Sequence, residues 1–162
     1  MPNIIPHIWY TDRAEEAARF YASVLPDSSI DSVTAIPADS PSGPAGSVGV
    51  VEFTLCGQPF MAISAGPLDE LNHSISFMVL CDSQEEIDRY WEALSEGGAI
   101  EDCGWVRDRF GLAWQIVPRL LHELMKDSDR DRARRVAETM LTMKKLNIAK
   151  LEEAAKLEPS SR

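Results

Sequence analysis

Apolar and polar residues alternate along most of the chain up to Pro118, and two longer segments with helical spacing interrupt this alternation. Alternation with a period of two is typical of β-strands, whereas apolar residues three and four positions apart are typical of a helix. The pattern therefore predicts one strand, one helix and three further strands, twice in succession. The expected strands span residues 4–10, 29–36, 47–56, 59–64, 74–80, 99–103, 105–107 and 112–118.

Both expected helices have recognisable ends. Asp12 is expected to cap the first helix, and Asp82 or Ser83 the second, because a short side-chain oxygen can accept a hydrogen bond from a first-turn amide. The first helix is expected to end before Pro26, which cannot donate the next helical hydrogen bond. The second is expected to end at Gly97, where glycine can take the left-handed conformation.

One local sequence occurs twice. AEEAARFY begins at Ala14 and QEEIDRYW begins at Gln84, 70 residues later, with identical glutamates and arginine and an aromatic residue at the end of both. Such a repeat indicates a duplicated structural unit. We therefore expect an α+β protein of two tandem βαβββ modules, residues 1–66 and 73–118, followed by a helical extension, residues 119–158, all in one structural domain.

The extension has helical spacing over residues 120–126 and 130–144. Its second helix has an apolar stripe, which must pack either on the sheet or helices of its own chain or on a partner subunit. The sequence does not separate these alternatives. We predict a homodimer on the basis of this stripe. The stripe consists of Ala133, Val136, Ala137, Met140 and Leu141.

Composition and charge narrow the classes of function. Apolar residues make up 44% and charged residues 26% of the 162 residues, a balance typical of a globular protein. A net charge of −10 without a basic stripe argues against nucleic acid as a partner. No apolar run reaches the length of a membrane span and the start lacks the features of a signal peptide, so we expect a cytoplasmic protein without a membrane partner.

The three cysteines, Cys56, Cys81 and Cys103, cannot all pair, and none lies in a CxxC spacing typical of zinc sites or redox motifs. We expect reduced thiols. Cys81 and Cys103 could lie near a pocket, yet nothing in the sequence indicates an activated, nucleophilic thiol.

Four segments carry a family resemblance: PHIWYTDRAEEAARFY, GQPFMAISAGP, SISFMVLCDSQEEIDRYWEAL and CGWVRDRFGLAWQIVP. They resemble the PhnB-like branch of the vicinal oxygen chelate superfamily, also labelled 3-demethylubiquinone 3-methyltransferase-like. The likeness runs from Ile4 to about Leu151. It implies the glyoxalase/bleomycin resistance fold, in which two βαβββ modules form a curved mixed sheet around a concave pocket. The superfamily includes isomerases, dioxygenases, thiol transferases and drug-binding proteins, so the fold leaves the activity open.

In metal-dependent relatives, each module supplies one ligand from its first strand and one from its last. The resemblance places these positions at His7, Met61, Phe77 and Gln115. His7 could offer a ring nitrogen and Gln115 a carbonyl oxygen, but Met61 is a soft thioether and Phe77 has no ligand atom. Two usable ligands do not make a catalytic metal site, so we expect no tightly bound metal and no other cofactor.

The methyltransferase label has no support from a nucleotide-type motif. Methyltransferases that use S-adenosylmethionine typically have a glycine-rich loop between a strand and a helix. Here Gly43, Gly46 and Gly49 lie in a loop that leads to a strand, and Gly97 and Gly98 end a helix. Whether the protein is an enzyme therefore stays open.

Strand alternation extends the ligand-equivalent positions to a predicted pocket face, and Trp105 is expected at the pocket mouth. Residues of opposite parity are expected to contact the two helices: Ile8, Tyr10, Phe60, Met78, Leu80, Trp114 and Ile116. The expected ligand-binding residues are His7, Trp9, Met61, Phe77, Val79, Trp105 and Gln115.

His7 and Glu52 are the weak catalytic candidates. Glu52 shares the pocket face if Phe53 and Leu55 point to the helices, and a carboxylate near an imidazole can prepare a general base. A lone histidine on an apolar strand face is more often a hydrogen-bonded core residue, and we favour that interpretation. Asp108 is expected to hold its own turn through backbone amides.

We compare three functions. The first is binding of a small apolar or aromatic molecule without altering it, which the incomplete ligand set favours. The second is an enzyme, either a methyltransferase or a metal-independent isomerase or lyase. The third is a dimeric scaffold with a vestigial pocket.

Overall fold

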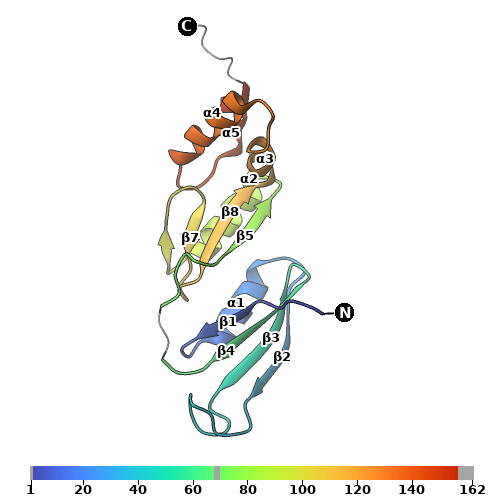
Figure 1. The fold of residues 1–162 in the computed structure, drawn as a ribbon, viewed down its shortest axis with the longest axis vertical. Helices are drawn as coiled ribbons and strands as arrows, with labels where there is room; N and C mark the ends of the chain where they lie inside the picture. The colour runs from blue at the N-terminus through green and yellow to red at the C-terminus, as the bar shows by residue number, and fades with distance from the viewer. Residues whose placement is uncertain (1, 68–69, 157–162) are drawn as a thin grey trace. The chain divides into compact units, whose positions relative to one another are not determined.

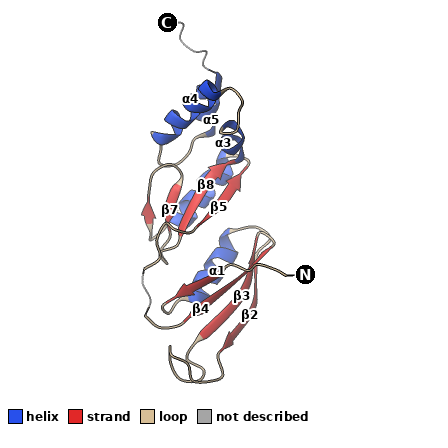
Figure 2. Ribbon diagram, in the orientation of Figure 1, coloured by secondary structure: helices blue, strands red, loops and turns tan. Residues whose placement is uncertain are grey.

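The computed structural model describes residues 2–67 and 70–156. The chain folds into two compact units, Met1–Glu70 and Leu71–Arg162. In the described residues, each unit contains a four-stranded sheet with a helix against one face (Figures 1 and 2). That the two modules make one structural domain stays a prediction.

The first unit has the expected βαβββ order. Its sheet has the strand order β1-β4-β3-β2, in which β1 is parallel to β4 and the other neighbours are antiparallel. Helix α1 packs against the sheet through alanines and Tyr21, whose hydroxyl hydrogen-bonds that of Tyr10 at 2.9 Å. The elements are β1 His7–Tyr10, α1 Ala14–Val24, β2 Ser29–Ala35, β3 Gly49–Leu55 and β4 Gln58–Ser64.

The second unit repeats this topology. Its sheet has the strand order β5-β8-β7-β6, again with the first and last strands of the module parallel. The α+β fold of two βαβββ modules is thereby confirmed. The elements are β5 Ser76–Cys81, α2 Gln84–Ser95, β6 Ala99–Ile100, β7 Trp105–Arg107 and β8 Ala113–Pro118.

The helix starts differ from the prediction in one case. Ser83 caps α2 by accepting a hydrogen bond from Glu86 N, one of the two expected arrangements. Asp12 does not cap α1, so that prediction is wrong: the N-cap position is Arg13, without a side-chain cap. Ser64 Oγ, at the end of β4, instead accepts the hydrogen bond from Ala14 N at 2.9 Å.

The C-terminal extension forms three helices that lie beyond the ends of β5 and β8 in Figure 1: α3 Arg119–Leu124, α4 Arg130–Leu141 and α5 Ile148–Lys156. They enclose an apolar cluster that Leu80 of β5 also contacts. The buried members of this cluster are Val117, Leu121, Val136, Met143, Leu146, Leu151 and Ala154.

The apolar stripe of α4 packs within its own chain. Ala133 and Val136 are buried, and Met140 packs against the same cluster, whereas Leu141 is 64% exposed. Of the two alternatives for the stripe, packing within its own chain is confirmed for Ala133, Val136 and Met140. The homodimer loses this support and stays a prediction. In the part of the chain that the structure describes, no helix is long and apolar enough to cross a membrane.

Candidate functional site

The first sheet has one face away from α1, and four side chains cross it in register. His7 on β1 pairs with Met61 on β4, Met61 pairs with Glu52 on β3, and Glu52 pairs with Ser32 on β2. Paired residues on neighbouring strands point to the same face of a sheet. Ile8, Tyr10, Phe53, Leu55 and Phe60 are buried on the α1 side, as predicted.

The open face of the first sheet also exposes Trp9, which is 42% accessible and pairs with Ile63. His7, Trp9, Met61 and Glu52 therefore share one face, as the alternation predicts. Tryptophan side chains are usually more buried than this. The exposed indole of Trp9 is therefore available to a ligand.

His7 and Glu52 share this face but lie on β1 and β3, which are not neighbouring strands. β4 separates them, so their backbones lie two strand spacings apart, about 9.6 Å. Glu52 accepts a hydrogen bond from Ser32 Oγ at 2.9 Å, on the side away from His7. The structure thus gives no direct pairing of the kind that would prepare His7 as a general base.

In the second sheet, the predicted parity of β5 is wrong. Phe77 pairs with Trp114, with ring centroids 5.7 Å apart, and Val79 pairs with Ile116. Trp114 and Ile116 are buried, so Phe77 and Val79 belong to the side that α2 covers. They are not on the open face where the sequence analysis placed them.

The residues that replace them on the open face are Met78 and Leu80, which were expected to contact α2. Met78 pairs with Gln115 and is 46% exposed, and Leu80 pairs with Val117 and is covered by the C-terminal cluster. Val117 shares the face of Gln115, two residues before it on β8.

A difference of one residue between the two modules explains the error. Three residues, 11–13, connect β1 to α1, but only Asp82 and Ser83 connect β5 to α2. The helices align at a shift of 70 residues, whereas the strands before them align at 71. Because side chains alternate along a strand, this single residue moves each side chain of β5 to the opposite face. The counterpart of His7 is therefore Met78, and not Phe77.

Three side chains cross the open face of the second sheet in one row. Met78 pairs with Gln115 on β8, and Gln115 pairs with Trp105 on β7. Gln115 Nε2 donates a hydrogen bond to Ser76 Oγ at 2.9 Å, which fixes the orientation of the amide. A thioether, an amide and an indole thus come from three adjacent strands.

Beside this row lies a polar network that the sequence analysis did not identify. One carboxylate oxygen of Glu101 lies 2.6 Å from His73 Nε2, and the other lies 3.3 Å from Arg107 Nη2. The His73 ring also lies 5.5 Å from the Trp105 ring, centroid to centroid. Only Arg107 had a sequence signal, because it lies two residues after Trp105 and shares its face.

Residues 2–117 match the family described as 3-demethylubiquinone-9 3-methyltransferase. The chain belongs to this family. The match ends at Val117, short of the expected Leu151. No curated protein matches the chain.

Solved structures support the same fold. A candidate 3-demethylubiquinone-9 3-methyltransferase, the PhnB protein from Bacillus cereus, is 28% identical with a TM-score of 0.64, over 72% of this chain and 99% of that chain. A protein from Pseudomonas aeruginosa is 24% identical with a TM-score of 0.56, over 73% of this chain and 98% of that chain. The fosfomycin resistance protein FosX from Listeria monocytogenes is 13% identical with a TM-score of 0.56, over 78% and 98%. These neighbours confirm the glyoxalase/bleomycin resistance fold within the vicinal oxygen chelate superfamily.

The donor set of this family member does not fit a hard metal ion. A FosX structure from Listeria monocytogenes contains Mn(II). The corrected ligand-equivalent positions here are His7, Met61, Met78 and Gln115, of which two are thioethers, whereas manganese prefers oxygen donors. Within residues 2–67 and 70–156, no three His, Cys, Asp or Glu side chains are grouped closely enough to hold a metal ion.

The family name also implies a methyl donor, and the helix starts do not offer the usual nucleotide-type cradle. In the described residues, none of the five helices is directly preceded by a glycine, since the residues before them are Arg13, Ser83, Pro118, Asp129 and Asn147. A glycine-rich loop before a helix is what brings backbone amides to such cofactors in doubly wound folds. S-adenosylmethionine therefore has no recognisable site of that type here.

Two of the three cysteines, Cys56 and Cys81, lack the environment of nucleophiles. Cys81 is buried at the end of β5, and burial, with a contribution from Glu86, raises the pKa of its thiol to about 12. Cys56 is exposed in the turn before β4, where partial burial and then Asp27 raise its pKa. Both thiols are therefore protonated at neutral pH.

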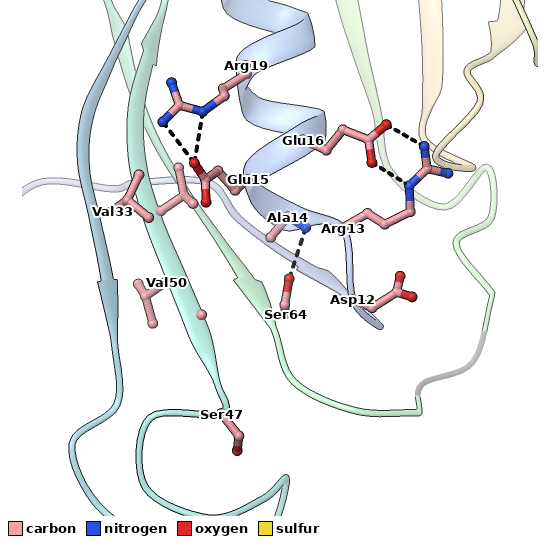
Figure 3. Close-up of a pocket in the computed structure, with 12 residues that line it drawn as sticks. Asp12, Arg13, Ala14, Glu15, Glu16, Arg19, Val33, Ser47, Val50 and Ser64 are labelled. Carbon is pink, nitrogen blue, oxygen red and sulfur yellow. Dashed lines mark hydrogen bonds and ion pairs between the residues drawn. The ribbon is translucent and has the colours of Figure 1, made fainter.

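A separate cleft of about 570 Å³ lies on the α1 side of the first unit (Figure 3). Four of its five charged side chains form two ion pairs, Arg13 with Glu16 at 2.6 Å and Arg19 with Glu15 at 2.8 Å, and the fifth is Asp12. The described lining contains none of the predicted site residues. Because both arginines of the cleft are already paired and none of the predicted site residues lines it, the cleft is a weaker candidate than the open sheet faces.

Proposed function

We propose that this protein binds a small, largely apolar or aromatic molecule on the open faces of its sheets, without a metal ion. The observation that carries the proposal is the row Met78–Gln115–Trp105 on the second sheet, where apolar groups flank one oriented amide. Small-molecule sites typically combine apolar and aromatic lining with a few placed polar groups. His7, Trp9 and Met61 supply a similar set on the first sheet.

Each member of the row has a defined part in the proposal. Trp105 offers an indole against which an aromatic ring can stack, a contact that contributes about 0.5–1.5 kcal/mol beyond area burial. Met78 offers a flexible thioether that adapts to ring edges. Gln115, held by Ser76, can both donate to and accept from a carbonyl or hydroxyl group of the ligand.

The family name makes methyl transfer the alternative function, and a titration separates the two. The binding proposal predicts that S-adenosylmethionine produces no saturable heat in calorimetry with the purified protein. Saturable binding of S-adenosylmethionine together with methylation of an added quinol would overturn the binding proposal in favour of an enzyme.

Native mass spectrometry of the freshly purified protein provides the main test, because a ligand that is retained adds a discrete mass. After identification, the molecule is titrated back into protein from which it has been removed, with tryptophan fluorescence as the signal. W105F is expected to weaken binding by at most about tenfold, because the smaller phenyl ring keeps only part of the stacking contact of the indole. W91F is the matched control, since Trp91 belongs to α2 and its side chain is buried. Equal affinities for W105F and W91F would contradict the proposed site.

A further inference from the structure

The C-terminal extension lies outside the family match, which ends at Val117. The Bacillus cereus PhnB structure is matched over 99% of its length by only 72% of this chain, so that protein has no counterpart of the remaining part. The extension is therefore a feature added to a fold that is complete without it. Its contacts with the second unit indicate what it does.

The segment between α4 and α5 runs along the hairpin turn that joins β6 to β7. Met143 O accepts a hydrogen bond from Cys103 N at 2.8 Å, and Lys144 O accepts one from Gly104 N at 2.7 Å. Lys144 Nζ also lies 3.2 Å from Asp102 Oδ1. We call residues 143–146 the strap.

The turn beneath the strap has an unusual backbone. Cys103 and Gly104 have φ values of 57° and 85°, and Trp105 N donates to Asp102 O at 3.1 Å, as in a type I′ turn. A non-glycine residue at positive φ persists when its surroundings hold it there. The two central amides of this turn donate their hydrogen bonds to carbonyl groups of the strap. Without the strap, these amides would have to bond to water.

Leu146 packs directly on this turn and is fully buried. A Cβ atom placed on Gly104 would lie 3.0 Å from Leu146 Cδ1 and 2.8 Å from Ile116 O. The absence of a side chain at Gly104 thus lets the turn fit between β8 and the strap. Gly104 O accepts a further hydrogen bond from Ile116 N at 2.7 Å.

The other side of the strap is fastened to the start of α2. Gln84 Nε2 donates to Leu146 O at 3.1 Å, and Gln84 Oε1 accepts from Ile148 N at 2.9 Å. Lys145 Nζ lies 2.6 Å from Asp88 Oδ1. The strap is therefore held between α2 and the turn, and its position does not depend on either contact alone.

We propose that the strap is a positioning device for Trp105, which is the first residue after the turn. β6 and β7 are only two and three residues long, too short to fix the turn by their own pairing. By satisfying both turn amides and packing Leu146 on Gly104, the strap sets the direction in which the indole enters the open face. The effect on ligand binding rests on the proposed function, whereas the ordering of the turn does not.

Amide hydrogen exchange in the full-length protein tests the ordering directly. L146A is compared with L151A, a control that removes an equally buried leucine from the same apolar cluster in α5. Exchange at Cys103 and Gly104 is expected to be about tenfold faster in L146A than in L151A, because local opening of the turn no longer needs to displace Leu146. Equal exchange in the two variants would overturn the proposal.

A second variant leaves the core intact, in case L146A does not fold. Q84A removes the two hydrogen bonds between α2 and the strap, and Q58A is its control on the exposed start of β4. Faster exchange at Cys103 and Gly104 in Q84A supports the strap. If L146A does not fold, wild-type rates in Q84A would refute it.

Quenching of tryptophan fluorescence by acrylamide then reports on Trp105 without any ligand. The contribution of Trp105 is the difference in signal between a variant and the same variant carrying W105F. Acrylamide is expected to quench this contribution more steeply in L146A than in L151A. If a retained molecule is identified, it should bind L146A about threefold more weakly than L151A, and equal binding would contradict the positioning role. If no molecule binds the wild type, the proposed function fails, while exchange and quenching still decide the strap.

Discussion

Asp108 provides the sharpest test of how the strands of the second site are held in place. Its side chain is only 3% exposed and lies in the turn between β7 and β8. One carboxylate oxygen accepts hydrogen bonds from Phe110 N at 2.8 Å and Leu112 N at 3.1 Å, and the other accepts one from Trp114 Nε1 at 2.8 Å. The role predicted from sequence, holding its own turn, is confirmed, and the bond to Trp114 extends it to β8.

The expected losses follow from these three bonds. D108N keeps one oxygen for the backbone amides but turns an NH₂ group toward the indole N–H, so it should lower the free energy of unfolding by about 2 kcal/mol. D108A removes the acceptor of all three hydrogen bonds, two of which come from buried residues, and should cost about 4 kcal/mol. Since domains have about 5–15 kcal/mol of stability, D108A should remove a large part of it.

Urea denaturation followed by tryptophan fluorescence measures these losses, because Trp91, Trp105 and Trp114 all lie in the second unit. D12N is the exposed control, expected to stay within about 0.5 kcal/mol of the wild type. In a W114F background, D108N should cost about 1 kcal/mol less, since the opposing indole donor is gone. The reasoning is refuted if D108N and D12N have the same stability, or if the cycle shows no coupling.

Three further predictions concern other parts of the chain. S64A should destabilise the protein by about 1 kcal/mol through the start of α1, whereas D12A should not, as urea denaturation will reveal. Iodoacetamide with peptide mapping should modify Cys56 before Cys81, which reacts only after unfolding; early labelling of Cys81 would contradict its burial. The homodimer is tested by light scattering across a dilution series, and 18.0 kDa at every concentration would disprove it.

Local patterns predicted most elements because strands and helices depend on nearby residues. Every expected strand is present, although the edge strand predicted at residues 99–103 is reduced to Ala99–Ile100 by the turn at Cys103 and Gly104. The start of α1 could not be read in the same way. Its hydrogen-bond acceptor is Ser64, 50 residues further along the chain, and no local pattern signals a partner at that distance.

The contacts of the strap could not be predicted from the sequence either. Its acceptors are the backbone carbonyls of Met143 and Lys144, which every residue type possesses. Only the turn beneath the strap could be expected from the sequence, because Gly104 directly precedes β7 and glycine before a strand often marks a tight hairpin turn. What the turn contacts depends on the packing of α4 and α5, which local spacing does not specify.

Met78, and not Phe77, takes the ligand-equivalent position on β5. This corrected assignment does not provide a donor for a hard cation, because the Met78 side chain is a thioether. Each sheet now presents one methionine in its first- or last-strand pair, Met61 beside His7 and Met78 beside Gln115. A thioether binds hard cations poorly but contacts aromatic rings favourably. The two methionines therefore make the open faces more suitable for the proposed apolar or aromatic molecule than for a hard cation.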